Sequence, residues 1–168
     1  VEADAITFTG LIGACEHGGE VARAMHLLAE MSRRAVETDS RAFSPAIRAI
    51  GRGGVAWVRA LEVLADMDAQ GVPPSTATCN SAITVCARYG AWIKALELFG
   101  LMQCRRVPAN ELTYTAAMCA CDLHNAWAHV LELYISLGTS GLPVDNMVTT
   151  LALNARMAHG RQMGGART

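Results

Sequence analysis

The feature that most constrains this sequence is a repeat with a period of about 35 residues. Small or branched apolar residues recur at intervals of 36, 35 and 35 residues, at Ala24, Ala60, Ala95 and Val130. The same intervals separate four longer apolar residues, Met31, Met67, Met102 and Leu137. A period of this size is typical of helical solenoids, because one unit alone cannot bury its apolar face. The sequence therefore predicts an all-α solenoid.

Each repeat is predicted to be a helix-turn-helix unit. In the third repeat, a mostly apolar helix over 77–88 is interrupted at Tyr89-Gly90, and an apolar pattern then resumes up to Val107-Pro108. Glycine ends helices because it adopts the left-handed conformation without a steric cost. Asparagine is the best substitute in that conformation. Equivalent breaks are therefore predicted at Gly18-Gly19, Gly53-Gly54 and Asn125.

The period divides the chain into four complete repeats and two partial ones. The complete repeats are 5–39, 40–75, 76–110 and 111–145, with the end of a preceding repeat at 1–4 and a partial fifth repeat at 146–168. We expect Gly160 to break the fifth repeat and the tail after it to fray. Because the chain begins at Val1 and shows no targeting segment, we expect a fragment of a longer protein.

Composition excludes several classes of protein. With 52% hydrophobic and 17% charged residues, the chain can form a substantial core and is not intrinsically disordered. The net charge of -1 provides no basic surplus, so any nucleic-acid site must be local. No apolar run approaches the roughly 18 residues of a membrane span. The six cysteines lack the spacing of a disulfide framework, which favours reduced, packed thiols.

Two groups of residues invite functional interpretations that the pattern disfavours. Cys119 and Cys121 lie two residues apart, so on a helix their sulfurs point in nearly opposite directions and do not form a metal site with His124. Tryptophan recurs at 35-residue intervals at the start of the second helix in the second, third and fourth repeats, at Trp57, Trp92 and Trp127. We expect these rings to pack between repeats rather than to stack on bases. No arrangement of residues indicates an enzyme.

The repeat resembles the pentatricopeptide repeat family. The resemblance rests on the openings Thr7-Phe8 and Thr113-Tyr114, the glycine break, the apolar second helix and the Gly-Val-Pro type of close. It covers residues 4 to about 160 and is weakest in the second repeat, at Arg41 and Ala42. It implies a right-handed superhelical α-solenoid of chloroplasts or mitochondria that binds single-stranded RNA, one base per repeat. It further implies RNA-processing proteins as partners, with no catalysis, cofactor, metal, small-molecule substrate or membrane.

The resemblance also implies which residues recognise the bases. In the family these are the fifth and last residues of each repeat, which here are Thr9 with Asp39, Ser44 with Ser75, Asn80 with Asn110, and Thr115 with Asp145. All are short polar side chains that can form hydrogen bonds with an unpaired base. By analogy with the family, a Thr–Asp pair favours guanine, an Asn–Asn pair favours a pyrimidine, and the Ser–Ser pair is ambiguous.

Two further sets of residues follow from the same resemblance. The second residue of each repeat is expected to flank the base, and these are Ile6, Arg41, Ala77, Leu112 and Met147. A cation near the end of the first helix is expected to approach phosphate, which selects His17, Arg52 and Arg88. Leu123 interrupts this row in the fourth repeat. With so few phosphate contacts, we expect weak binding by four repeats alone.

Both the site and the function have alternatives. The last residues of the repeats lie where helix N-caps are needed, and capping alone favours Ser, Asn and Asp there. The fifth residues lie inside helices, where Thr and Asn have poor propensity, so capping does not explain them. The alternative function is a protein-binding helical scaffold of the tetratricopeptide type, which the near-neutral charge and Leu123 favour.

Overall fold

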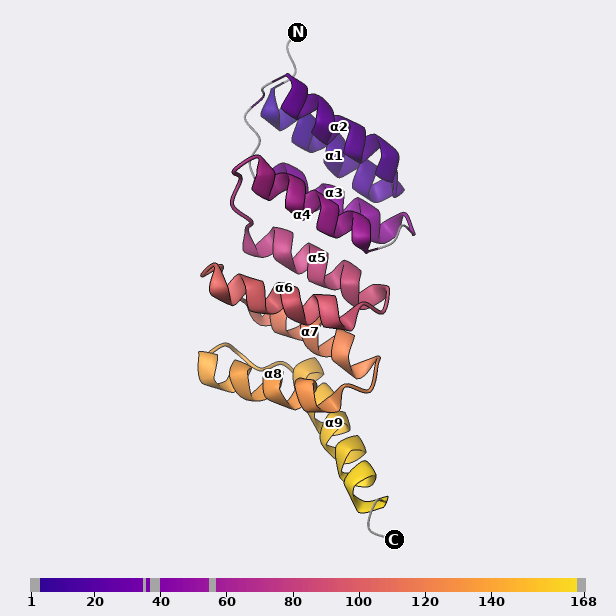
Figure 1. Cartoon of the computed structure of the whole chain (residues 1–168), viewed down its shortest axis with the longest axis vertical. Coiled ribbons are helices and arrows are strands. Elements are labelled where there is room, and N and C mark those ends of the chain that lie inside the picture. Colours follow the sequence, from indigo (N-terminus) through magenta and orange to yellow (C-terminus); the bar gives the residue numbers. More distant parts are fainter. Residues whose placement is uncertain (1–3, 35, 37–39, 55–56, 166–168) are drawn as a thin grey trace. The chain divides into compact units, whose positions relative to one another are not determined.

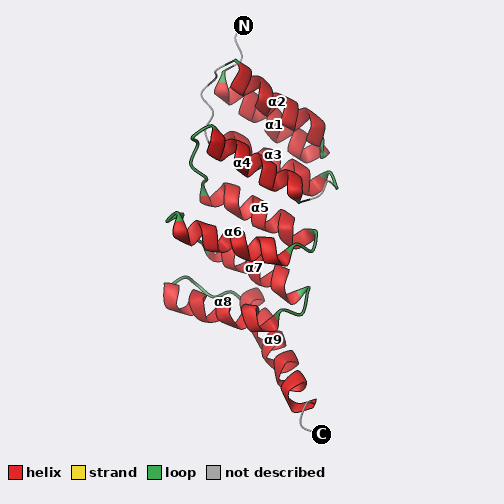
Figure 2. Cartoon of the chain, viewed as in Figure 1, coloured by secondary structure: helices red, strands yellow, loops and turns green. Residues whose placement is uncertain are grey.

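The computed structural model describes residues 4–34, 36, 40–54 and 57–165, with side chains up to Gly160. All regular secondary structure in these ranges is α-helical (Figures 1 and 2). The helices are α1 (Ala5–Gly18), α2 (Val21–Arg33), α3 (Ser40–Arg52), α4 (Val58–Ala69), α5 (Thr76–Arg88), α6 (Trp92–Cys104), α7 (Glu111–Asp122), α8 (Trp127–Ser140) and α9 (Asn146–Gly165). The predicted all-α class is confirmed. Each odd-numbered helix begins at the first residue of a predicted repeat.

The chain forms two compact units, Val1–Val85 and Cys86–Thr168, and α5 crosses the boundary between them. In the first unit, α1 packs against α2 and α3, while α3 also contacts α2 and α4. In the second unit, α7 packs against α6, α8 and α9, and α8 also contacts α9. Within each unit, first helices therefore contact one another directly, and a second helix packs against the next first helix.

The periodic apolar residues form the core of both units. All eight are at most 1% exposed, namely Ala24, Ala60, Ala95, Val130, Met31, Met67, Met102 and Leu137. Alanine at three of the four small positions lets helices approach closely, and the longer side chain seven residues later fills the space two turns along. The apolar residues that recur with the sequence period are therefore the ones that are buried in the core.

The predicted helix breaks are confirmed by the backbone. Gly19, Gly54 and Gly90 have φ angles of 63°, 72° and 76°, and Asn125 has a φ angle of 58°. The Gly53 backbone also lies close to the preceding turn, since a Cβ added there would be 2.7 Å from the Gly19 carbonyl oxygen. Successive turns in the first unit therefore pack backbone against backbone, which requires glycine.

The break predicted at Gly160 is wrong, because α9 continues through it to Gly165 (Figure 1). A Cβ at Gly160 would meet no atom within 4 Å, and its φ is not positive. Glycine inside a helix costs only about 1 kcal/mol relative to alanine. In the described residues no second helix follows to fix a turn by packing. The predicted fraying of the tail concerns 166–168, which lie outside the described residues.

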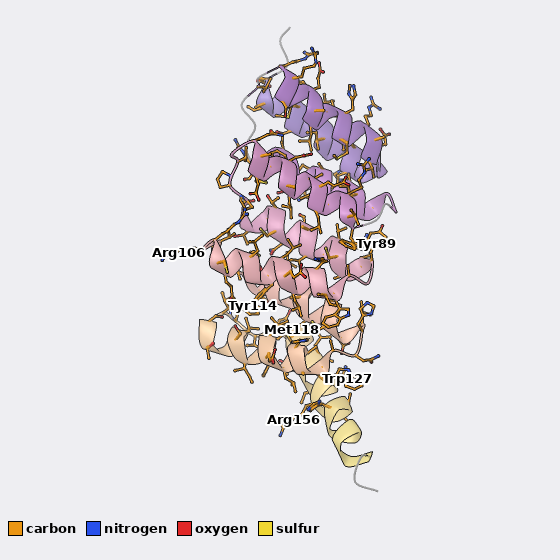
Figure 3. All side chains as sticks on the ribbon, in the orientation of Figure 1. Tyr89, Arg106, Tyr114, Met118, Trp127 and Arg156 are labelled. Atoms are coloured by element: carbon orange, nitrogen blue, oxygen red, sulfur yellow. The ribbon has the colours of Figure 1, made fainter. Side chains whose placement is uncertain are left out.

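Aromatic side chains connect neighbouring helices of the second unit. The Trp92 ring at the start of α6 lies 5.8 Å from the His129 ring of α8, which confirms packing between repeats for this tryptophan. Tyr114 of α7, labelled in Figure 3, packs edge-on against Phe99 of α6 at 5.0 Å. Its hydroxyl lies 3.2 Å from Ser136 Oγ on α8. Side chains of α7 therefore contact both second helices beside it.

Candidate nucleic-acid interface

Each unit contains one groove that gathers several of the predicted site residues. The first-unit groove has a volume of about 350 Å³ and is lined by Thr9, Gly13, Ser40, Arg41, Ser44, Pro45, Arg48, Ser75 and Ala77. The second-unit groove has a volume of about 570 Å³ and is lined by Asn110, Glu111, Leu112, Thr115, Leu142, Pro143, Asp145 and Met147. The second-unit groove lies at the N-terminal ends of α7 and α9, whereas the first-unit groove runs along α1 and α3 as far as Gly13 and Arg48 and reaches the first turn of α5.

Thr115 and Asp145 provide hydrogen-bond acceptors in the second-unit groove. Thr115 Oγ1 donates its hydrogen to the Glu111 carbonyl oxygen at 2.9 Å, which leaves its lone pairs available. Asp145 Oδ1 accepts the Val148 N–H at 2.7 Å. In the described part of the chain, no hydrogen bond uses the second carboxylate oxygen of Asp145. Two acceptors in one groove suit a ligand edge that carries two donors.

Large apolar side chains provide the remaining surface of this groove. Leu112 on the first turn of α7 is 59% exposed, and Met147 on the first turn of α9 is 52% exposed. Both side chains line the same groove, so they form one continuous exposed apolar surface there. The groove thus combines apolar surface with a polar edge, which is the pattern of a site for a planar heterocycle.

The first-unit groove contains a chain of hydroxyl groups instead. Thr78 Oγ1 lies 3.0 Å from Ser44 Oγ and 2.8 Å from Ser75 Oγ. Ser44 Oγ also donates to the Ser40 carbonyl oxygen at 3.3 Å. Thr78 is fully buried, so this network joins α3 to the start of α5. The predicted Ser44–Ser75 pair is brought together, but its hydroxyl groups are already hydrogen-bonded to Thr78.

The charged side chains of the first-unit groove are arginines, whereas those of the second-unit groove are carboxylates. Arg41 and Arg48 both line it, and among the residues that the structure describes no carboxylate does. Arg48 Nη2 lies 2.8 Å from Glu16 Oε2, and Arg52 Nη2 lies 3.6 Å from Glu16 Oε1. The hydrogen bond from Arg48 holds the pKa of the Glu16 carboxyl below its usual value, and burial opposes this shift only in part. The cluster therefore keeps one excess positive charge beside the groove.

Arg48 was not among the residues selected from the sequence. The signal was present, because Arg48 follows Ser44 by four residues and so lies on the same helical face. The partner of Arg48 could not be foreseen, since Glu16 is on a different helix, 32 residues earlier. Gly13, which also lines the groove, leaves open space where a side chain would stand.

The remaining predicted residues are distributed outside the grooves or at their edges. Ile6 is 80% exposed on the first turn of α1, and Asp39 lies outside the described residues. Asn80 is buried on α5 in the first unit, whereas Asn110 lines the groove of the second unit. The predicted phosphate contacts lie in the last turns of α1, α3 and α5, at His17, Arg52 and Arg88. None of these three cations lines either groove.

The capping interpretation holds for those last residues of the repeats that the structure describes. Asp4 and Asn110 accept the backbone N–H of Thr7 and Thr113, at 2.8 Å and 3.1 Å, and Asn110 completes a capping box. Ser75 Oγ accepts from the Thr78 N–H at 3.2 Å. Asp145 does the same at α9. Capping and groove lining therefore coexist in the same side chains.

Among the residues that the structure describes, no group of three His, Cys, Asp or Glu side chains is placed to hold a metal ion. Cys121 is buried and Cys119 is half-buried, and burial raises the pKa of both thiols, that of Cys121 to about 12. None of the described helices has the length and apolar character that spanning a membrane requires.

The fold and the grooves define a class, that of helical repeat proteins with ligand grooves on their first helices. Two family models match the sequence, the PPR repeat family over residues 74–122 and the PPR repeat over residues 6–36. The chain is 31% identical over 87 residues to chloroplastic pentatricopeptide repeat-containing protein 10 of Zea mays. Residues 6–36 and 74–122 are therefore repeats of the pentatricopeptide type. The match to the maize protein covers 52% of this chain and 11% of that protein.

Solved structures share the fold over almost the whole chain. The maize protein in complex with an 18-nucleotide psaJ RNA element superposes with a TM-score of 0.78 at 23% identity, covering 96% of this chain and 23% of that one. The PPR domain of Arabidopsis thaliana protein-only RNase P 1, in complex with tRNA, gives a TM-score of 0.77 at 16% identity, covering 92% and 81%. At these identities the similarity establishes the helical repeat fold.

Proposed function

We propose that this chain binds single-stranded RNA through its first helices and that each complete repeat recognises one base. The observation that supports this most directly is the second-unit groove, which places Thr115, Asp145, Leu112 and Met147 in one cavity. These are the fifth, last and flanking residues that the family resemblance selects. The maize and Arabidopsis proteins, which have the same fold, form complexes with RNA.

The chemistry of this groove suits guanine. Guanine presents a ring N–H and an amino group on its pairing edge, and Thr115 Oγ1 with the second oxygen of Asp145 provides two acceptors. Leu112 and Met147 offer apolar surface on which the ring can stack. In this proposal the chain recognises RNA and does not itself catalyse a reaction. Bound RNA would be protected, remodelled or presented to processing enzymes, in a chloroplast or mitochondrion.

A protein-binding scaffold is the second candidate, and one observation favours it. Leu123 occupies the position of an expected phosphate contact and is 68% exposed, while Glu111 and Asp145 place two carboxylates at the second-unit groove. A polyanion is attracted weakly by such a surface. Binding to RNA and its dependence on salt therefore distinguish the two functions.

The test is equilibrium binding of the chain to a randomised RNA pool at two salt concentrations. We expect enrichment of a short motif and an affinity that falls as salt rises, because phosphate contacts release counterions. An absence of both enrichment and salt dependence would overturn the proposal in favour of the protein scaffold.

A substitution tests the assignment of the base-recognising pair. Thr115→Asn should move the preference at one position of the motif from guanine toward uracil, because an amide beside Asp145 adds a donor where Thr115 offers only an acceptor. Thr139→Asn is the matched control, since Thr139 is exposed on α8 and lines neither groove. An unchanged preference with retained binding in Thr115→Asn would show that the pair is misassigned.

A further inference from the structure

The two grooves have opposite hydrogen-bonding character, although they occupy equivalent places in the repeat. The second-unit groove contains the carboxylates of Glu111 and Asp145 and, among the described residues, no cation. The first-unit groove contains the guanidinium groups of Arg41 and Arg48 and, in the ranges that the structure describes, no carboxylate. Guanidinium groups suit a base edge that carries acceptors, whereas carboxylates suit an edge that carries donors.

Serine hydroxyls alone do not determine the preference of the first-unit groove. Ser44 and Ser75 both lie within hydrogen-bonding distance of Thr78, and Ser44 also donates to the Ser40 carbonyl. Breaking these buried hydrogen bonds to contact a base would offset most of the gain. The strong donors at this groove are the guanidinium groups.

Glu16 holds Arg48 in place. The Glu16 side chain is only 10% exposed and lies 2.8 Å from Arg48 Nη2, while the Arg48 side chain remains 44% exposed. An arginine has five N–H donors, so the contact with Glu16 leaves most of them available to a ligand. A guanidinium that is already oriented loses less conformational freedom on binding than a free side chain does.

The position of Arg48 is specific to this repeat. The corresponding residues of the other complete repeats are Gly13, Thr84 and Cys119, none of which is a cation. Gly13 also lines the first-unit groove, and its missing side chain leaves open space. The predicted phosphate contacts His17 and Arg52 do not line this groove, so a ligand group inside it meets Arg48 instead.

We infer that Arg48 is the specificity-determining residue of the second repeat and donates two hydrogen bonds to a guanine base. This inference rests on the RNA-binding function proposed above. Guanine presents two neighbouring acceptors, O6 and N7, to a guanidinium fork, whereas adenine places an amino donor beside N7. The first-unit groove therefore prefers guanine over adenine, although its serine pair alone is ambiguous.

The test compares base preferences of the full chain and its variants in the randomised RNA pool. In Arg48→Met, which keeps an unbranched side chain, we expect guanine preference over adenine to fall about tenfold at one motif position and to persist at the others. Arg48→Lys should not restore it, because an ammonium group lacks the planar fork. Glu16→Gln should weaken the preference several-fold, since it removes the charge that orients Arg48.

Arg59→Met is the matched control, because Arg59 is exposed on α4, pairs with Glu62 and does not line the groove. It should leave the guanine preference unchanged. A uniform loss of affinity for all sequences in Arg48→Met, with a salt dependence reduced by about one phosphate, would overturn the inference in favour of a phosphate contact. Unchanged preferences in Arg48→Met would also overturn it while leaving RNA binding intact. If the unmodified chain enriches no RNA, both proposals fail together.

Discussion

At the scale of single residues, Asp145 performs two roles with one carboxylate. One oxygen accepts the Val148 N–H and so caps α9, and the same side chain lines the second-unit groove. Ser75 combines a cap and a groove position in the same way. The two interpretations that the sequence presents as alternatives are therefore compatible. Under the proposed function, the cap would fix the side chain that recognises the base before RNA binds.

Glu16 provides a residue-scale prediction about stability. Glu16→Gln should lower the free energy of unfolding at pH 7 by about 1–2 kcal/mol, because a charged, buried hydrogen bond to Arg48 is lost. The folded-state pKa of Glu16 is below its usual value, so its stabilisation is complete above the unfolded-state pKa and is lost as pH falls through the folded-state pKa. The difference between the two proteins should therefore shrink below about pH 4.

The measurement is urea unfolding followed by circular dichroism at a series of pH values. Glu62→Gln is the control, because Glu62 pairs with Arg59 on an exposed face and should change stability by less than about 1 kcal/mol. A difference between Glu16→Gln and the unmodified chain that stayed constant down to pH 3 would contradict the assignment.

At the scale of helices and turns, a glycine can either end a helix at a turn or lie inside a helix, and the sequence alone does not distinguish the two cases. Gly90 lies in the turn between α5 and α6 with a φ angle of 76°, and a Cβ there would lie 3.1 Å from His124 Nε2. Gly160 lies inside α9 with open space around it. The repeat pattern assigned a break to both. Only Gly90 is followed by a described helix whose packing requires the chain to turn.

A pair of substitutions tests this difference. Gly160→Ala should leave the fold intact and stabilise α9 by about 0.5–1 kcal/mol, because alanine has the higher helix propensity. Gly90→Ala should destabilise the protein by at least about 1–2 kcal/mol, because the left-handed conformation is unfavourable for alanine. Thermal unfolding of both variants measures these changes. Destabilisation by Gly160→Ala would mean that a turn forms at that position in solution.

At the scale of the whole molecule, packing contacts connect neighbouring helices within each unit. Leu137 is fully buried in the second unit, where α8 contacts α7 and α9. In a repeat protein each unit is stabilised mainly by its immediate neighbours, so the effect of a cavity should remain local. A core substitution at this position therefore probes how far stability is shared along the chain.

Leu137→Ala should cost about 2–5 kcal/mol and increase amide hydrogen exchange in α7, α8 and α9 far more than in α1 and α3. Ile135→Ala on the same helix is the control, because Ile135 is 66% exposed and should change stability by less than about 0.5 kcal/mol. Exchange measured by mass spectrometry resolves the helices. An equal increase in all helices would show that the chain unfolds as a single cooperative unit.

The sequence by itself determined the helical hairpins, their turns and their buried residues. Each of these is a local property that recurs with the period, so Met67 and Asn125 could be assigned by comparison with their counterparts. Tertiary structure alone decided what the grooves contain. Thr78 engages the predicted serine pair, and Glu16 of α1 orients Arg48 of α3, because side chains far apart in sequence meet only when first helices pack together. Tertiary structure also decided that α9 continues through Gly160, because a glycine ends a helix only where packing against a following element stabilises a turn.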